Sequence, residues 1–274
     1  MPSCTCLYRG LLAALLAAAL PAWAIVGGTA TAGFGQVGHG VQITPNWVLT
    51  AAHAVLSPGA GYGNGFGSSL VAATFLSGAG PFPADDLALM RLVSPIAAPP
   101  LTLSADLLAP GPQPAMNVTI VSAAHQAPRG YGFSLLREVL DLVDVEGPPG
   151  TFTAVPVNWL VTYTDAGAGA PYVQGGDSGG GLFFGHVPDS ITPLMGITSA
   201  LIDRGSNDPP TQFSSGFVQL ASYRSWIDAT MLADGADDQF ALWASAVPEP
   251  AGWAIGLAGA ALLGGVARRR QRRA

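Results

Sequence analysis

The chain has 274 residues, of which 49% are hydrophobic and only 10% charged, and it contains 36 glycines and 23 prolines. So many helix-breaking residues argue against a helix-rich protein and favour short strands joined by turns, in one large all-β unit or two small domains. Between two apolar ends, residues 25–247 carry five arginines, no lysine and sixteen acidic residues. This acidic composition, with no basic patch, argues against binding to nucleic acid.

The first 24 residues have the pattern of a secretory signal peptide. Arg9 supplies a positive charge, residues 11–20 form an apolar run, and Ala22-Trp23-Ala24 provides a cleavage site with small residues at both ends. The apolar run is shorter than the roughly 20 residues that a transmembrane helix needs. We therefore predict that signal peptidase processes the chain and that a secreted body begins at Ile25.

Both cysteines of the chain, Cys4 and Cys6, leave with this peptide. The mature protein then has no disulfide, no thiolate metal site and no cysteine nucleophile. Its four histidines are scattered along the sequence. No metal or other cofactor is therefore predicted.

The body alternates turn-rich stretches with short apolar segments that are rich in β-branched residues, a pattern typical of β-barrels. Two glycine-rich stretches, residues 59–67 and 165–181, are expected to be loops. Residues 222–232 have helical spacing, with Ser222 as a candidate N-cap. The predicted strands are Val41–Thr50, Ser69–Leu76, Leu87–Val93, Asn117–Ser122, Leu135–Val145, Trp159–Thr164, Gly181–Phe184, Leu194–Ala200 and Gly216–Leu220.

The segment Trp47–Ala52 is an apolar strand that ends in small residues and is followed by His53. Such a strand can deliver an imidazole to a cleft, where the neutral ring accepts a proton from a nucleophile. Taken alone, a half-buried structural histidine is the simpler interpretation of His53.

Two acidic residues, Asp85 and Asp86, stand at the start of the alternating segment Leu87–Leu92. A carboxylate in that position can hold an imidazole in one tautomer and stabilise its protonated form. Exposed loop aspartates are the more common occurrence of such residues.

Glycines surround Ser178 in the run Gly175-Gly176-Asp177-Ser178-Gly179-Gly180. A serine hydroxyl is a weak nucleophile unless a base takes its proton and nearby donors stabilise the oxyanion that forms. Glycines let the backbone turn tightly and direct its N–H groups towards one point. A purely structural glycine-rich turn is the alternative interpretation.

Together, these three segments resemble the trypsin/chymotrypsin family of serine proteases in content and in order. The family's histidine box corresponds to Thr50–His53, its aspartate box to Asp86–Leu92 and its serine box to Gly176–Gly180. The aspartate box selects Asp86 over Asp85. A closing segment from Gly216 to Ile227 is also similar, so the resemblance covers residues 25–232.

The resemblance implies an all-β fold of two six-stranded antiparallel barrels with a C-terminal helix and with the active site between the barrels. It makes His53 the general acid and base, Asp86 its orienting carboxylate and Ser178 the nucleophile. The N–H groups of Gly176 and Ser178 would form the oxyanion hole. No cofactor is implied.

In this family an N-terminus reading Ile-Val-Gly-Gly inserts into the body and pairs with the aspartate before the catalytic serine. Here Ile25-Val26-Gly27-Gly28 directly follows the predicted cleavage site. We therefore expect signal peptidase itself to create the activating terminus, with the ammonium group of Ile25 paired to Asp177.

The resemblance also places a specificity pocket at Tyr172, Ser199 and Leu201. Trypsin-like members carry an aspartate at the position of Tyr172, and residues 170–176 contain no acid. Cleavage after lysine or arginine is thus disfavoured. Leu201 would narrow the pocket, which favours small or modest apolar side chains.

The last 28 residues combine Val247-Pro248-Glu249-Pro250, an apolar run over residues 251–267 and an arginine cluster at residues 268–273. Seventeen apolar residues are near the lower limit for a membrane-spanning helix, and the arginines favour a cytoplasmic end. An ordinary tail anchor would have these features. Their order resembles the PEP-CTERM sorting signal of Gram-negative bacteria, which implies recognition by an exosortase-type enzyme and export to the cell surface or outer envelope.

The sequence thus predicts four parts: a signal peptide (1–24), a protease domain (25–232), a linker (233–246) and a sorting and anchor segment (247–274). The predicted activity is hydrolysis of peptide bonds in protein or peptide substrates through an acyl-enzyme. A non-catalytic matrix or adhesion protein on a protease fold is the alternative, and an esterase could use the same triad.

Overall fold

The computed structural model describes residues 25–31, 33–80, 82–123, 129–148, 151–163, 171–187, 193–203, 213–234 and 240–245. The predicted signal peptide and the predicted sorting segment lie outside these residues. Among the residues described, no helix is both long enough and apolar enough to cross a bilayer.

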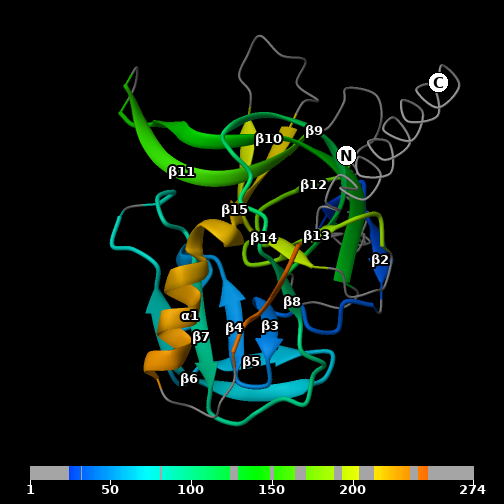
Figure 1. Ribbon diagram of the computed structural model, residues 1–274, viewed down its shortest axis with the longest axis vertical. Helices are drawn as coiled ribbons and strands as arrows, with labels where there is room; N and C mark the ends of the chain where they lie inside the picture. The colour runs from blue at the N-terminus through cyan, green and yellow to red at the C-terminus, as the bar shows by residue number, and fades with distance from the viewer. Residues whose placement is uncertain are drawn as a thin grey trace, which may run out of the picture.

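The described chain is built almost entirely from antiparallel strands, with one α-helix near its C-terminal end (Figure 1). The N-terminal strands are β1 (Ile25–Val26), β2 (Thr29–Thr31), β3 (Val41–Thr44), β4 (Trp47–Thr50), β5 (Gly61–Asn64), β6 (Gly67–Leu76), β7 (Ala88–Leu92) and β8 (Thr102–Ser104). The later strands are β9 (Gly111–Val121), β10 (Arg129–Glu146), β11 (Phe152–Tyr163), β12 (Tyr172–Val173), β13 (Gly181–Phe184), β14 (Leu194–Asp203), β15 (Phe213–Gln219) and β16 (Leu242–Ala244). The helical segments are η1 (Ala52–Ala54), η2 (Leu220–Tyr223) and α1 (Arg224–Ala233).

The first half of the body is a sheet of five strands in the order β3-β4-β7-β6-β5. Its central strands, β4 and β7, are almost wholly buried, because both alternate sets of side chains face protein. No pairing among the described residues joins the two ends of this sheet, so a closed six-stranded N-terminal barrel stays a prediction.

The second half is a larger sheet in which β13 pairs with both β9 and β14. Following the pairings from β13 through β9, β10, β11, β15 and β14 therefore leads back to β13. Two further strands, β8 and β16, continue the sheet beyond β14 in parallel pairings. The outer ends of β10 and β11 extend away from the body as a long hairpin (Figure 1).

One buried apolar cluster joins the two halves. It contains Trp47 and Leu89 from the first sheet, Trp159 and Val218 from the second, and Ile227 from the helix. Burying aromatic and branched side chains at this junction stabilises the two sheets against each other. Helix α1 thereby lies beside β7, on the first half, although it follows the last strands of the second half (Figure 1).

Several sequence predictions need correction at the level of single elements. The predicted strand Val41–Thr50 is two strands, because the chain reverses between Thr44 and Trp47. The predicted loop 59–67 contains β5, which pairs with β6. Ser222 is not the N-cap, since α1 begins after Tyr223.

The predicted linker 233–246 also contains regular structure. Strand β16 pairs with β8, and Trp243 donates a hydrogen bond from Nε1 to Asp228 of α1 at 2.9 Å. Asp234 forms an ion pair with Arg91 at 2.9 Å. The chain therefore continues to contact the body up to Ser245, whose hydroxyl donates to Asp106.

Candidate active site

Three segments from both halves of the body meet at the candidate site. His53 lies in η1, immediately after β4, and Asp86 lies two residues before β7. Because β4 and β7 pair with Thr50 opposite Ala88, the ends of both strands bring these two residues to one edge of the first sheet. Ser178 follows the turn that leads out of β12 in the second half.

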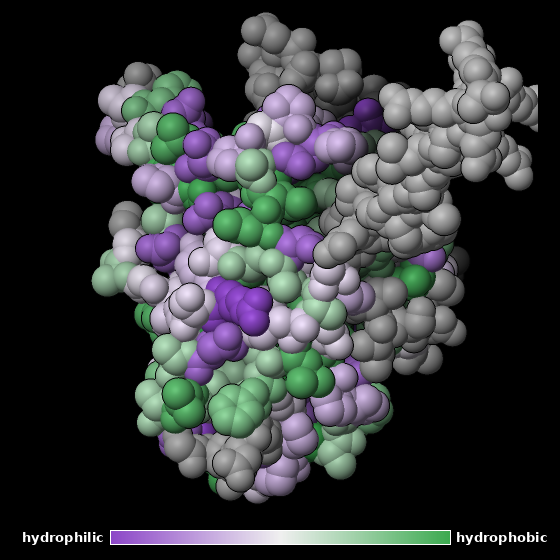
Figure 2. Space-filling view, viewed as in Figure 1, coloured by the Kyte–Doolittle hydropathy of each residue, from purple (hydrophilic) through white to green (hydrophobic). Residues whose placement is uncertain are grey.

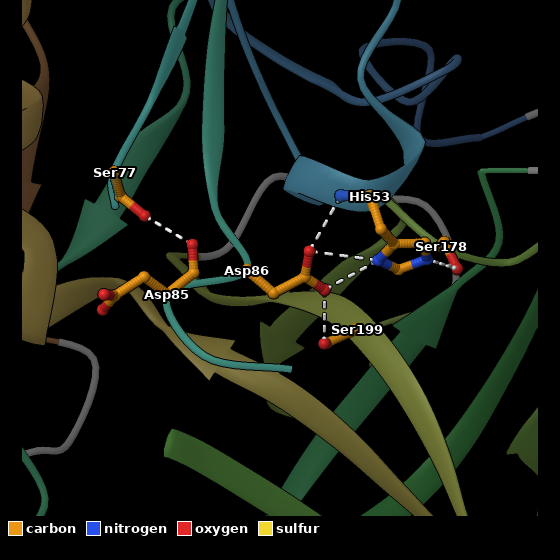
Figure 3. A network of polar contacts seen from close by, with 6 residues as sticks. All are labelled: His53, Ser77, Asp85, Asp86, Ser178 and Ser199. Atoms are coloured by element: carbon orange, nitrogen blue, oxygen red, sulfur yellow. Dashed lines mark hydrogen bonds and ion pairs between the residues drawn. The ribbon is translucent and has the colours of Figure 1, made fainter. Parts of the chain in front are cut away.

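The imidazole of His53 bridges the other two side chains (Figure 3). Its Nδ1 lies 2.8 Å from one carboxylate oxygen of Asp86 and 3.0 Å from the other, and its Nε2 lies 2.8 Å from the hydroxyl oxygen of Ser178. An ionised carboxylate only accepts hydrogen bonds, so Nδ1 carries the proton and donates it. In the neutral ring Nε2 is then the acceptor for the Ser178 hydroxyl.

Asp86 is buried and receives two further hydrogen bonds. The backbone N–H of His53 donates to Oδ1 at 2.9 Å, and the Ser199 hydroxyl donates to Oδ2 at 2.6 Å. The carboxylate of Asp86 is 2% exposed, whereas the His53 side chain is 34% exposed. The arrangement fixes the carboxylate and leaves the imidazole accessible to a ligand.

The segment around Ser178 is shaped by glycines. The N–H of Asp177 donates to the Gln174 carbonyl at 3.1 Å, and Gly176 has φ +99°, which together make a type II turn. Gly179 has φ +86°, and a Cβ at that position would lie 2.4 Å from the Thr50 hydroxyl oxygen. A larger residue at either glycine would be strained, so the motif's glycines set the path of the chain on both sides of Ser178.

A second buried carboxylate lies next to Ser178. Asp177 is fully buried, and it accepts hydrogen bonds from the Ser122 hydroxyl at 2.6 Å and from the Gln174 N–H at 2.8 Å. Burial raises the pKa of Asp177 to about 6, although both hydrogen bonds act in the opposite direction.

Ile25, the predicted partner of Asp177, is also fully buried. Strand β1 pairs Ile25 with Val173 of β12, just before the turn that leads to Asp177. In this chain the nitrogen of Ile25 is a peptide nitrogen, because residues 1–24 precede it.

The predicted pocket residues lie on neighbouring strands. Tyr172 in β12 packs its ring against Phe213 at a centroid distance of 4.9 Å. The N–H of Val173 in β12 donates to the hydroxyl of Ser215, which is paired with Leu201 of β14, so β12 and β14 both contact the same part of β15. The side chain of Ser199, in contrast, is turned towards Asp86.

Two neighbours of the triad were not predicted from the sequence. Besides the Ser199 hydroxyl, the ring of Phe82 contacts His53 edge-on, with the ring centroids 4.9 Å apart. Phe82 is 50% exposed. Its position depends on the turn before Asp86, and no motif in the sequence signals that turn.

A sequence profile of the Trypsin family matches residues 23–227 of the chain. The chain belongs to the trypsin family. Its described part accordingly has a mostly β, trypsin-like fold with one short C-terminal helix. No curated protein sequence matches the chain.

The chain is also similar to three solved structures of peptidases. The Rv3671c protease from M. tuberculosis in its active form is 19% identical with a TM-score of 0.45, and the alignment covers 73% of this chain and 74% of that one. Neuropsin, a serine protease of mouse brain, is 21% identical with a TM-score of 0.45, covering 70% and 87%. Kallikrein-related peptidase 10 in complex with Zn²⁺ is 22% identical with a TM-score of 0.42, also covering 70% and 87%.

Proposed function

We propose that this trypsin-family protein is a secreted serine endopeptidase that uses His53, Asp86 and Ser178 as its catalytic triad. The observation that carries the proposal is the continuous hydrogen-bonded chain from the Asp86 carboxylate through both nitrogens of His53 to the Ser178 hydroxyl. The three residues come from separate segments of the chain, and each has the partner that its role requires.

The geometry supports the following reaction. The Ser178 oxygen attacks the carbonyl carbon of a peptide bond while its proton passes to Nε2 of His53, and Asp86 stabilises the imidazolium that results. The imidazolium then gives the proton to the leaving amine, the C–N bond breaks and an acyl-enzyme remains. A water molecule, deprotonated by His53, hydrolyses this ester and restores Ser178.

The oxyanion of each tetrahedral intermediate needs donors that are already in place. We assign this role to the N–H groups of Gly176 and Ser178. They flank Asp177, whose own N–H is bonded to Gln174 within the type II turn. Loss of one such donor costs other enzymes of this chemistry about 3–4 kcal/mol of transition-state stabilisation.

Activation by signal peptidase is a second part of the proposal. Cleavage after Ala24 would turn the Ile25 nitrogen into an ammonium group, and Asp177 is a buried carboxylate whose two hydrogen-bond donors are both neutral. The Ile25 side chain already occupies a buried apolar cluster with Val118, Ile120 and Val173. N-terminal sequencing of the exported protein should give Ile25 as the first residue, and a start at any other residue would contradict this part.

The pocket residues support cleavage next to a small or modest apolar side chain. Tyr172 stands where trypsin-like members carry an aspartate, and Leu201 would narrow the pocket. A long basic side chain would therefore lack both a partner charge and the space it needs. A peptide library cut by the exported enzyme should show apolar residues before the cut site and few lysines or arginines.

The tail, residues 247–274, is proposed to act as a sorting signal that an exosortase-type enzyme recognises, with the body on the outer face of the inner membrane before processing. Replacing Pro248-Glu249-Pro250 with alanines should leave the full-length chain in the membrane fraction. Release into the medium at the normal rate would contradict this part.

A serine-directed fluorophosphonate provides the first test of the activity. The exported protein should be labelled and its Ser178→Ala variant should not. Absence of labelling in a folded protein that begins at Ile25 would favour the non-catalytic matrix or adhesion protein. Parallel assays with peptide and ester substrates would distinguish a peptidase from an esterase.

A further inference from the structure

Helix α1 is attached to strand β7 near both of its ends. Before the helix, the Tyr223 hydroxyl donates a hydrogen bond to Oδ1 of Asp85 at 3.0 Å, just ahead of β7. After the helix, Asp234 forms its ion pair with Arg91 near the other end of β7. Between these contacts Ile227 and Met231 are buried in the cluster that also contains Leu89 of β7. The second of these attachments is remote from the triad, but the first is next to Asp86.

Asp85 has an unusual backbone conformation for its residue type, with φ +47°. Non-glycine residues adopt this left-handed conformation uncommonly, although aspartate tolerates it better than most, and contacts of Asp85 stabilise it here. Two of these contacts converge on the Asp85 carbonyl, which accepts from the Ser77 hydroxyl at 2.7 Å (Figure 3). It also accepts from the Leu87 N–H at 2.7 Å.

The bond from the Leu87 N–H to the Asp85 carbonyl closes a three-residue turn with Asp86 at its centre. The direction of the Asp86 carboxylate therefore depends on the conformation of Asp85. The Asp85 side chain itself lies against Gly78. A Cβ atom at Gly78 would lie 2.4 Å from Oδ2 of Asp85, so the side chain fits only because residue 78 is a glycine.

From these contacts we infer that Tyr223 is a positioning residue for Asp86: by holding the Asp85 side chain, its hydroxyl keeps the turn that aims the Asp86 carboxylate at His53. The inference rests on the proposed function, because it assigns Asp86 its role in catalysis. It also gives the C-terminal helix, which belongs to the second half of the chain, a part in shaping a turn of the first half.

Tyr223 can act as a donor over the whole neutral pH range. Burial raises the pKa of its hydroxyl above the usual range, and the neighbouring Asp85 carboxylate raises it further.

The test is the rate at which the fluorophosphonate acylates Ser178 as a function of pH, because this rate needs no known substrate and reports the deprotonation of His53. Tyr223→Phe should lower the rate about three- to tenfold, the equivalent of one hydrogen bond. The substitution should also move the fall of the rate at low pH, the acid limb of the profile, to lower pH. A displaced Asp86 stabilises the His53 imidazolium less well, so the ring loses its proton more easily. Asp86 contacts the ring directly, whereas the charge of Asp85 acts from further away.

Two variants connect the effect to the turn. Gly78→Ala should displace Asp85 and give the same change in rate and acid limb, and combining it with Tyr223→Phe should add little. Asp85→Asn keeps an acceptor for Tyr223 and tolerates the left-handed conformation, so it should stay within about twofold of the wild-type rate.

Arg91→Gln is the matched control, because it breaks the remote attachment of the same helix. It should lower the melting temperature and leave the pH profile of acylation unchanged. If Tyr223→Phe and Gly78→Ala also lower only the melting temperature, the inference is wrong and Tyr223 has a structural role. A wild-type protein that is not acylated at all would instead overturn the proposed function, and the inference with it.

Discussion

The site contains two buried aspartates whose surroundings differ in one respect. Asp86 is 3% exposed and Asp177 is 0% exposed. Asp86 accepts hydrogen bonds from His53, a group that can become a cation, and from Ser199. Among the residues that the structure describes, Asp177 accepts from two neutral donors, the Ser122 hydroxyl and the Gln174 N–H.

This difference shows what burial demands of a carboxylate. Hydrogen bonds from neutral groups replace part of the lost hydration, but they do not neutralise the charge, and burial raises the pKa of Asp177 to about 6 despite both of them. Around Asp86 the cation forms during the proposed reaction. Around Asp177 a cation would form only when the chain is cut before Ile25. The two carboxylates would therefore gain their cationic partners in different ways.

The largest effect is expected from Asp86→Asn. The amide of asparagine can donate to Nδ1 of His53, and the ring proton would then lie on Nε2. A protonated Nε2 cannot accept the hydrogen bond from the Ser178 hydroxyl. Acylation should fall about 10⁴-fold, as it does when this change is made in a related triad. The rate constant for fluorophosphonate labelling measures it, with circular dichroism as a check on folding, and a loss of less than tenfold would contradict the role of Asp86.

Asp177→Asn should have the next largest effect, and only in the cleaved protein. A buried ammonium without its partner carboxylate costs about 3–5 kcal/mol, so the Ile25 terminus would leave its pocket and activity would fall about 150- to 5,000-fold. Labelling rates of the two exported proteins provide the measurement. Equal rates would show that Asp177 has no part in activation.

The pH dependence of stability separates the uncleaved chain from the cleaved one. In the uncleaved chain the pKa of Asp177 rises from 3.8 to about 6 on folding, so the folded state binds more protons between these values. Its free energy of unfolding should then decrease by about 2 kcal/mol as the pH rises from about 4 to 6, out of about 3 kcal/mol over the whole titration.

Urea denaturation of the uncleaved Ser178→Ala chain at several pH values tests this, with Asp177→Asn in the same chain as the control that removes the contribution. After cleavage the ammonium of Ile25 should hold the pKa of Asp177 down, and the sign of the contribution should reverse. The same slope in both forms would argue against the proposed ion pair.

The smallest effect is expected from Ser199→Ala, which removes one of the hydrogen bonds to Asp86. The carboxylate keeps its bonds to His53, so acylation should fall only about three- to tenfold. Ser199→Thr, which retains the hydroxyl, is the matched variant and should recover part of the rate. If the alanine variant matches the wild type, the Ser199 hydroxyl does not contribute to holding Asp86.

The contacts of the triad were the most predictable part of the site, because each member lies in a short motif that identifies it. The choice of Asp86 over Asp85 followed from the residues after it, and the structure places Asp86 against His53. The roles of the three residues stay proposals that the labelling experiments test.

Features that depend on strand register were less predictable. Ser199 was assigned to the pocket wall, but the pairing of β14 with β15 shifts between Thr198 and Ala200, and the hydroxyl faces Asp86. Strand β5 was mistaken for a loop because glycines fill it, although its pairing with β6 holds it in place. Ser122 and Tyr223 reach their aspartates from remote segments, and no local pattern marks such contacts.

The attachment of β16 limits how far the body can lie from the C-terminal tail. Because the chain still contacts the body at Ser245, only five residues separate the folded part from the apolar run that begins at Ala251. Fully extended, this connection spans at most about 20 Å, which is less than the roughly 45 Å width expected for a domain of this size. If the apolar run enters a membrane, this short connection would hold the body against the membrane surface, and substrates of the proposed enzyme would have to reach it there. Cutting the tail would release the body from the membrane.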